Sequence, residues 1–319
     1  MRSGFIGFYH DYFIDKSQLL KDATIVVDTN VLLDIYRYSK ETANQILNML
    51  ENIKTQLWMP YQVAYEYHKD RNEKVLGGHI RTYTQLINKI EEWEKAFDEE
   101  RKHPFLGEKE FTDLMQHLSE IRKILCGGKD NCSQLILNDE YKNRIADCYE
   151  GKLGADYSKE DKEKYILEAK SRYERQIPPG YKDYKKPDNE CGDYIIWKQM
   201  IDYAQTNHCP IIFVSNDMKE DWIEDVAGLK LGPRQELIDE FYKLTQQYFY
   251  CYSLKQFISI INETQQLVNK NAQDEIAKIY EEQHPTIIEQ TIDGTTQTSS
   301  PVEIFTGEVM CEEQNSSEV

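Results

Sequence analysis

The stretch Ala23-Thr-Ile-Val-Val-Asp-Thr-Asn-Val-Leu-Leu33 decides the fold that the sequence predicts. Residues 24–27 form a short run rich in β-branched side chains, as in strands that are buried on both faces of a sheet. Asp28 follows this run, and apolar residues then return at helical spacing. An acid at the carboxyl end of a buried parallel strand lies where open α/β sheets bind ligands. Taken alone, the pattern fits a helix cap equally well, since Asp28 and Thr29 both favour that position.

A second buried strand is predicted at residues 209–215, and it also ends in polar and acidic residues. Asn216 and Asp217 follow it directly, and Asp221 lies four positions beyond Asp217. Strands that alternate with helices predict a parallel α/β sheet, whose strands all end at one edge. We therefore expect Asp28 and Asp217 to lie close together.

Two further acids lie on predicted helices. Glu66 belongs to a helix at about 62–71, near the border of its buried side, and Asp193 opens the helix after a Pro- and Gly-rich loop. Read alone, Glu66 is an ordinary solvated helix charge, and Asp193 is an anion that stabilises the first helical turn. Asp183 lies within the loop, where an acid forms a turn as readily as it supports a site.

Helical periodicity dominates the middle of the chain. The Cys-Gly-Gly-Lys-Asp-Asn stretch at 126–131 is expected to interrupt these helices, because paired glycines favour turns. A third, weaker strand is expected at 248–252. The expected organisation is an α/β core from residues 1–74 and 177–262, a helical insertion at 75–176, a C-terminal helix at 263–282 and a disordered acidic tail at 283–319.

The composition limits the possible functions. There are 38 basic and 56 acidic residues, a net charge of -18, and nine of the acids follow residue 280. An acidic body argues against a protein that coats nucleic acid through cations, but not against an enzyme that binds phosphates through metal ions. The sequence has no apolar run of membrane-spanning length, no secretory h-region and no zinc-finger spacing among its seven cysteines. These features predict a cytoplasmic protein with reduced thiols and no membrane contact.

The predicted fold brings Asp28, Glu66, Asp193 and Asp217 to the carboxyl edge of the sheet. Oxygen ligands without His or Cys suit Mg²⁺ or Mn²⁺. Such ions activate water and neutralise a phosphodiester during its hydrolysis. Because acids at strand ends are common, their spacing alone does not decide the function.

Six separated motifs follow one another along the chain: VVDTNVLL at 26–33, PYQVAYE at 60–66, PPGYKD at 178–183, CGDYIIW at 191–197, IIFVSNDMKEDW at 211–222 and GPRQELI at 232–238. Together they resemble the PIN-like nuclease superfamily, and in particular a bacterial PIN-like branch of unknown function. The resemblance covers about residues 4–262, with the central helices as the branch's own insertion. It implies an α/β fold, a three-layer α/β/α sandwich with a central, mainly parallel sheet and a long helical insertion.

The resemblance also assigns roles residue by residue. Asp28, Glu66, Asp193 and Asp217 match the four catalytic, metal-binding acids of the family, in chain order. The other candidates are Asp221 as an additional metal-site acid, Asn30, Asn216 and Asp183 as supporting residues, and Arg71, Arg234 and Lys219 as substrate-binding cations.

The function implied by the resemblance is that of a hydrolase, an Mg²⁺- or Mn²⁺-dependent endonuclease that leaves a 3′ hydroxyl and a 5′ phosphate. The favoured substrate is RNA (tRNA or mRNA), cut by a toxin or an antiphage-defence effector. A regulatory protein partner such as an ATPase sensor, and a homo-oligomer, are further expectations.

Two other functions stay open. A structure-specific or non-specific DNA nuclease would use the same four acids. A non-catalytic module would bind only a metal or a partner through them. The intact set of acids argues against this last reading, because unpaired carboxylates repel one another in the metal-free protein.

Overall fold

A parallel sheet of three strands, in the order β1-β2-β5, lies at the centre of the fold. Strand β1 (Thr24–Val27) pairs with β2 (Ile211–Val214), and β2 pairs with β5 (Phe249–Tyr252). All of β2 and β5 is buried, and so are the last three residues of β1. Apolar, β-branched and aromatic side chains form such strands because they pack well on both faces. The strands predicted at 24–27, 209–215 and 248–252 are therefore confirmed.

The structure is a computed structural model that describes residues 1–9, 16–100, 107–183, 191–227 and 229–283. By their contacts, Met1–Ala277 form one unit and Lys278–Val319 a second. The tail expected at 283–319 lies outside the described residues, except for its first position. Among the described helices, none combines the length and apolar character that crossing a membrane requires.

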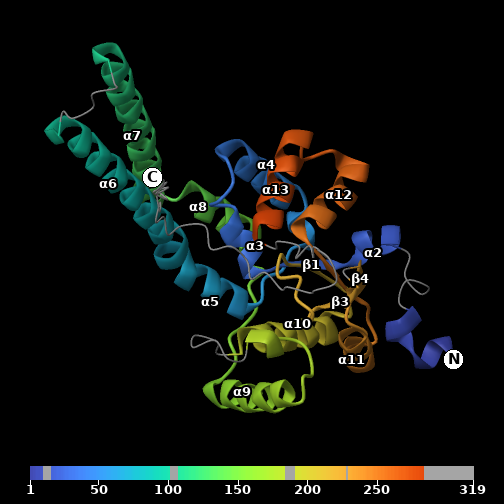
Figure 1. The fold of residues 1–319 in the computed structure, drawn as a ribbon. Helices are drawn as coiled ribbons and strands as arrows, with labels where there is room; N and C mark the ends of the chain where they lie inside the picture. Colours follow the sequence, from blue (N-terminus) through green and yellow to red (C-terminus); the bar gives the residue numbers. More distant parts are fainter. Residues whose placement is uncertain (10–15, 101–106, 184–190, 228, 284–319) are drawn as a thin grey trace, which may run out of the picture. The chain divides into compact units, whose positions relative to one another are not determined.

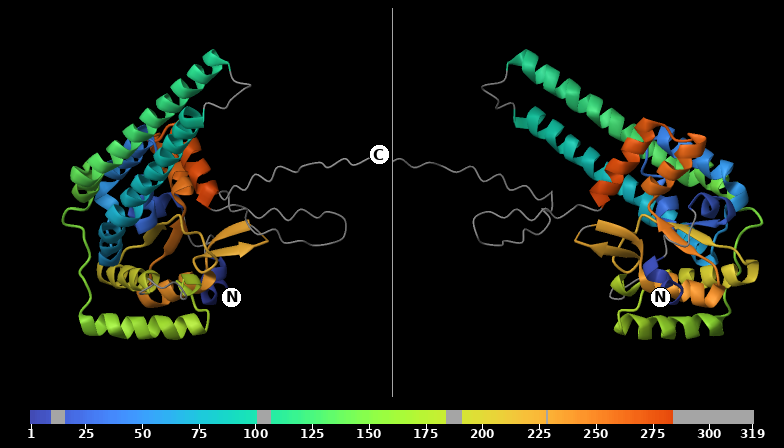
Figure 2. Two further views of the ribbon diagram at one scale, coloured as in Figure 1. Left: turned by 60° about the vertical axis from the view of Figure 1, so that its left-hand side comes forward. Right: turned by 90° about the vertical axis from the view of Figure 1, so that its right-hand side faces the viewer.

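Helices cover both faces of the sheet, which gives the expected three-layer α/β/α sandwich. Figure 1 shows α10 (Gly192–Asn207) and α11 (Gln235–Thr245) below the sheet. Helices α4 (Lys40–Asn52) and α12 (Leu254–Gln265) lie above it. The same separation of the helices into two layers is visible in the two views of Figure 2.

The segments on either side of β1 are helical, as the sequence predicts. Short helices precede the strand: η1 (Arg2–Gly4), η2 (Ile6–Tyr9) and α2 (Lys16–Asp22). After the strand, α3 (Thr29–Asp34) ends before Ser39, whose hydroxyl accepts a hydrogen bond from Thr42 N at 3.3 Å and caps α4. The stretch Ser39-Lys-Glu-Thr42 predicts a division into two helices, because Ser39 and Thr42 are both good helix caps, and the structure confirms this division.

The C-terminal part of the first unit differs from its prediction. In place of one helix at 263–282, the chain ends α12 at Gln265 and starts α13 (Lys270–Gln283) five residues later. Glu275 of α13 accepts hydrogen bonds from the Ser39 backbone N–H and hydroxyl, at 2.5 and 2.7 Å. This contact fastens α13 to the start of α4.

A hairpin between β2 and α11 was not expected. Its strands, β3 (Ile223–Val226) and β4 (Leu229–Pro233), pair antiparallel with a register shift between Glu224 and Asp225. The charged and largely exposed residues of β3 give no alternation of apolar and polar side chains, which is the usual strand signal. The apolar patch Leu57-Trp-Met-Pro-Tyr61 also predicts a brief strand, but Leu57 and Met59 each form a single parallel bridge instead.

The middle of the chain is helical, as predicted, but its glycine pair does not break a helix. The helix α7 runs from Glu108 to Leu137 through both Gly127 and Gly128. A Cβ at Gly128 would overlap the ring of Tyr83, so the missing side chain lets the two long helices approach closely. The helices of this region are α5 (Tyr61–Asp70), the π-helical η4 (Arg71–Leu76), α6 (Gly77–Glu100), α7, α8 (Glu140–Tyr149) and α9 (Lys159–Glu174).

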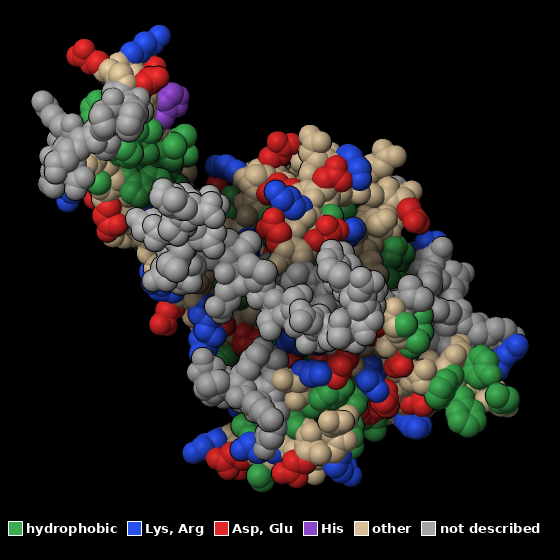
Figure 3. Space-filling view, viewed as in Figure 1, with side chains coloured by type: hydrophobic (Ala, Val, Ile, Leu, Met, Phe, Trp, Pro, Cys, Tyr) green, Lys and Arg blue, Asp and Glu red, His purple; other side chains and the backbone are tan. Residues whose placement is uncertain are grey.

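Helices α6 and α7 form a two-helix arm that carries large hydrophobic side chains on its surface. Trp93 is 57% exposed and Ile124 is 73% exposed. Figure 3 shows hydrophobic side chains gathered on this arm. The domain limits proposed from the sequence stay predictions, since the contacts place core and arm in one unit.

Trp197 of α10 is fully buried, and its ring packs against Trp222, Phe241 and Phe249 at centroid distances of 6.1, 5.6 and 5.0 Å. We expect Trp197→Ala to lower the free energy of unfolding by about 3–5 kcal/mol, because it leaves a large cavity beside the sheet. Urea unfolding measures this loss. The exposed Trp93 provides the control: Trp93→Ala should change stability by about 0.5 kcal/mol or less, and equal losses would contradict the assigned core.

Candidate active site at the carboxyl edge of the sheet

Asp28 lies where β1 ends, and it both caps α3 and faces the end of β2. One carboxylate oxygen accepts the Thr29 backbone N–H at 2.7 Å. The other accepts the Asn30 side-chain amide and the Ser215 hydroxyl, each at 2.6 Å. The side chain is buried, at 8% exposure for the residue. Asp28 therefore caps α3 and also lies at the carboxyl edge of the sheet, while its part in a ligand site stays a prediction.

Glu66 reaches the same edge from α5. Its oxygens accept hydrogen bonds from the Thr29 hydroxyl at 3.1 Å and the Gln62 side-chain amide at 2.8 Å. The start of α10 presses against it, because a Cβ at Gly192 would overlap Glu66 Oε1. Only glycine leaves room for Glu66 at this contact.

Asp193 follows that glycine in the first turn of α10. On its other side lies Gly180, where an added Cβ would be 3.1 Å from Asp193 Cβ and would overlap the Tyr173 hydroxyl. Gly180 has a φ of +91°, which an L side chain rarely adopts. The Pro-Pro-Gly loop thus needs its glycine both for its backbone and for its approach to Asp193.

Asp217 and Asp221 come from the segment that follows β2. Asp217 pairs with the Lys219 ammonium at 2.6 Å, and its backbone N–H donates to Ser215 Oγ at 3.0 Å. Asp221 is buried, and its Oδ2 accepts the Gly180 and Lys182 backbone N–H groups at 3.1 Å each. Within the part of the chain that the structure describes, its buried Oδ1 has no hydrogen-bond partner.

The four acids Asp28, Glu66, Asp193 and Asp217, called the acid quartet below, interact electrostatically. Burial raises the pKa of Asp28 to about 7; the Ser215 hydrogen bond opposes this rise, and the charges of Glu66 and Asp217 add to it. Burial also raises the pKa of Asp193 well above its usual range, and the charges of the other three acids and of Asp221 add to this rise. The pKa values of Glu66 and Asp221 are raised as well, chiefly by burial.

A divalent cation fits this donor set. Carboxylate oxygens are the hard ligands that Mg²⁺ and Mn²⁺ take. Asp221 Oδ1, which accepts no hydrogen bond from any described residue, is a further oxygen beside the quartet. Among the described residues, no three His, Cys, Asp or Glu side chains already stand in a geometry that could hold an ion. Carboxylates that repel one another are expected to stay apart in this way until a positive charge joins them.

The two supporting asparagines have different positions. Asn30 touches the quartet: its amide bonds Asp28 and Ser215, and its oxygen accepts the Asn216 backbone N–H at 2.9 Å. The Asn216 side chain instead bonds Asp34 Oδ2 at 2.9 Å and accepts the Leu254 N–H at 3.1 Å. It therefore joins α3 to α12. Asp183 closes the 3-10 turn η5 (Tyr181–Asp183) in the loop.

Two of the three predicted substrate cations are engaged elsewhere. Arg71 is 6% exposed and lies 3.3 Å from Asp139 of the insertion. Arg234 binds both carboxylate oxygens of Glu236 and lines a pocket of about 610 Å³ with Glu220, Glu224 and Asp225, an acidic setting for a phosphate. Only Lys219 contacts an acid of the quartet. Substrate binding by these residues stays a prediction.

Three side chains that support the quartet were not predicted to do so: Ser215, Gln62 and Thr29, the last named only as a possible helix cap. Each donates a hydrogen bond to Asp28 or Glu66. Ser215 directly follows β2, and Gln62 precedes Glu66 by one helical turn, so both positions carried a usable signal. These neutral donors orient the acids without cancelling their charge.

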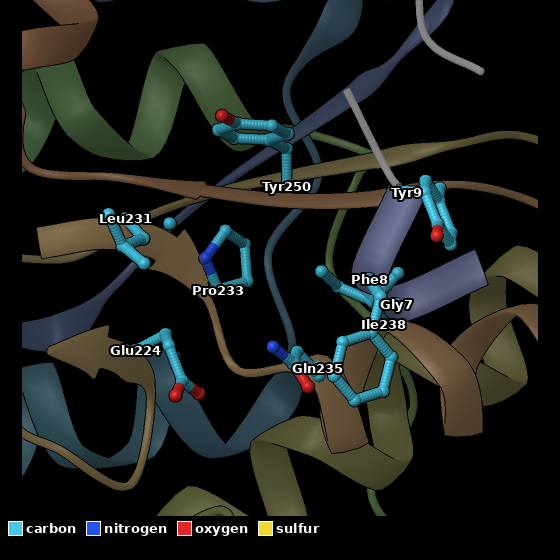
Figure 4. A pocket seen from close by; sticks show the side chains of 10 residues that line it. Gly7, Phe8, Tyr9, Glu224, Leu231, Pro233, Gln235, Ile238 and Tyr250 are labelled. Carbon is cyan, nitrogen blue, oxygen red and sulfur yellow. The ribbon is translucent and has the colours of Figure 1, made fainter. Parts of the chain in front are cut away.

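A separate pocket of about 430 Å³ lies between the N-terminal η2 and the β3–β4 hairpin (Figure 4). Phe8, Leu231 and Tyr250 are among its lining residues, with Glu224 at its rim. No acid of the quartet belongs to this described lining.

The chain matches a known protein family. The family model described as a PIN-like domain matches residues 24–237, a span that contains the whole acid quartet. Neither the curated proteins nor the solved structures contain a match to the chain.

The raised pKa values predict how stability depends on pH. Without metal, Asp28 should hold its proton up to about pH 7 when folded but only to about pH 4 when unfolded. Raising the pH through this window therefore favours unfolding, by about 2–3 kcal/mol between pH 5 and pH 8. Glu66, Asp193 and Asp221 act in the same direction.

Thermal midpoints measured with a chelator between pH 5 and pH 8 test this expectation. Asp28→Asn should make the fall in midpoint with pH shallower, because the variant lacks that ionisation. Asp22→Asn, at an exposed acid just before β1, should leave the fall unchanged. A wild-type midpoint that rises over this range would contradict the buried, mutually repelling acids.

Proposed function

Because the chain belongs to the PIN-like domain family, we propose that it is a metal-dependent endonuclease that hydrolyses phosphodiester bonds, with RNA as the favoured substrate. One observation carries the proposal. The acid quartet lies at the carboxyl edge of the sheet, where burial raises the pKa of Asp28 and Asp193 and the charges of other quartet members add to both rises. Structural acids are normally paired with cations or donors that lower their pKa, whereas a cluster of this kind is typical of functional sites.

In this proposal the quartet and Asp221 hold one or two Mg²⁺ or Mn²⁺ ions, which neutralise phosphate charge and lower the pKa of water. The chain itself orients the acids: Asn30 and Ser215 hold Asp28, while Thr29 and Gln62 hold Glu66. Such fixed orientation strengthens metal binding, because little ordering is left for the moment of binding. Protons bound to Asp28 and Asp193 must leave, so metal affinity should rise with pH.

The favoured setting is cleavage of tRNA or mRNA by a toxin or an antiphage-defence effector, and it rests on family resemblance. A regulatory protein partner such as an ATPase sensor, bound through the insertion, and a homo-oligomer belong to the same proposal. The second candidate is a DNA nuclease, because the same quartet could serve either polymer. The third is a module that binds metal or a partner without catalysis.

Mn²⁺ should stabilise the protein by mass action if it binds only the folded state. At a concentration 100 times Kd the gain is about 2.7 kcal/mol, which raises the thermal midpoint by about 5 °C for a chain of this size. Asp28→Asn should remove most of this shift at neutral pH. A variant that responds to Mn²⁺ as the wild type does would exclude Asp28 from the metal site.

Cleavage of labelled RNA and DNA tests the activity directly. With Mn²⁺ or Mg²⁺, the wild type should cut RNA, and Asp193→Asn should lower the rate by about 10²-fold or more. Asp202→Asn is the matched control. Asp202 lies on the same helix as Asp193, but in its C-terminal half, where it accepts a hydrogen bond from the Tyr157 hydroxyl. Cutting of DNA alone would favour the DNA nuclease. Metal binding without cutting of either polymer would favour the non-catalytic module.

A further inference from the structure

Glu66 lies on a helical rod that continues into the insertion. Helix α5 passes directly into the π-helical segment η4 and then into α6, so one rod runs from Tyr61 to Glu100. The π-helical turn starts at Arg71, five residues after Glu66. Such turns inside longer helices frequently accompany functional sites.

A buried polar network lies beside this turn. The Tyr36 hydroxyl donates to Asp139 Oδ2 at 2.7 Å and accepts from the Tyr67 hydroxyl at 2.8 Å, since its own proton is already engaged. Arg71 Nη1 lies 3.3 Å from the same Asp139 oxygen, an ionic contact that is not aligned as a hydrogen bond. The other Asp139 oxygen accepts the Lys142 N–H at 2.8 Å and caps α8.

This network braces the two helices that carry Asp28 and Glu66. Tyr36 follows α3, the helix that Asp28 caps, and Tyr67 is the neighbour of Glu66 on α5. At the site, the Thr29 hydroxyl of α3 bonds Glu66. Away from the site, the bond between Tyr36 and Tyr67 joins the same two elements again. One carboxylate of the insertion, Asp139, holds this second joint in place.

The energetics favour a role in position rather than in stability. Arg71 is 6% exposed and Asp139 is 4% exposed. Burying two charges costs hydration energy that their attraction often only balances, and apolar side chains of similar size frequently give equal or greater stability. A buried charge pair at this place therefore contributes chiefly by fixing one arrangement of the elements that it joins.

We propose that Asp139 and Arg71 are positioning residues through which the helical insertion fixes Glu66 within the candidate active site. The inference rests on the proposed function, because the metal-binding role of Glu66 is what makes its position matter. Without this brace, α5 is free to shift against α3, and Glu66 moves relative to Asp28. The insertion is then a working part of the site.

Titration of the full-length protein with Mn²⁺ alone, by calorimetry, tests the inference without relying on cleavage. Asp139→Asn should weaken Mn²⁺ binding about tenfold, the lower range for residues behind metal ligands. The amide still accepts from Tyr36 but no longer attracts Arg71. Tyr36→Phe removes a single hydroxyl from the network and should weaken binding in the same direction. It replaces Asp139→Asn if that variant does not fold.

The matched control is Arg144→Met. Arg144 lies on the helix that Asp139 caps and ties it to α4, through Glu51 at 2.7 Å and through Asn44 and Asn48. This variant should bind Mn²⁺ within about twofold of the wild type, even if its thermal midpoint falls by as much as that of Asp139→Asn.

The outcomes separate this inference from the proposed function. Unchanged affinity in both Asp139→Asn and Tyr36→Phe would overturn the positioning role. Equal losses in Asp139→Asn and Arg144→Met would also overturn it, because general loosening of α8 would then explain them. If the wild type itself binds no Mn²⁺, the proposed function fails and this inference falls with it.

Discussion

Repulsion between buried carboxylates is the constraint on which the rest of this structure depends. Parallel pairing places Val27 opposite Val214, so Asp28 and Ser215 leave the sheet side by side. Burial and neighbouring acids then raise the pKa of Asp28 and Asp193. The three donors that surround Asp28 offset part of this cost. A positive ion would be attracted most strongly at this same edge of the sheet.

Neutral and charged partners are used at different distances from this edge. Ser215 and Thr29 hold the acids through hydroxyl groups, which leave the negative charge in place. Guanidinium groups lie further out and join elements: Arg71 reaches the insertion, and Arg172 joins α9 to Glu240 of α11. These guanidinium pairs thus join elements away from the site, while at the edge itself the Lys219 ammonium pairs with Asp217.

Much of the fold and of the acid set was predictable, because both depend on local patterns. Runs of β-branched and aromatic residues predict buried strands. Each acid of the quartet lies just after such a strand or on a helix that packs near the end of one. The hairpin strand β3 carries no such pattern. The place of Gly128 within a helix was not predictable either, because it depends on the close approach of the Tyr83 ring from another helix. The partner of Arg71 was equally hidden, since Asp139 is distant in sequence.

Gly192 shows how a residue without a side chain limits the site. Its Cα faces Glu66 so closely that even a methyl group would displace the carboxylate. The space next to Glu66, rather than a charge, therefore limits which residue can occupy position 192. A neutral substitution at 192 would force the Glu66 carboxylate to move while leaving the formal charge and every acid of the protein intact, so an inventory of acidic residues alone would score such a variant as unimpaired.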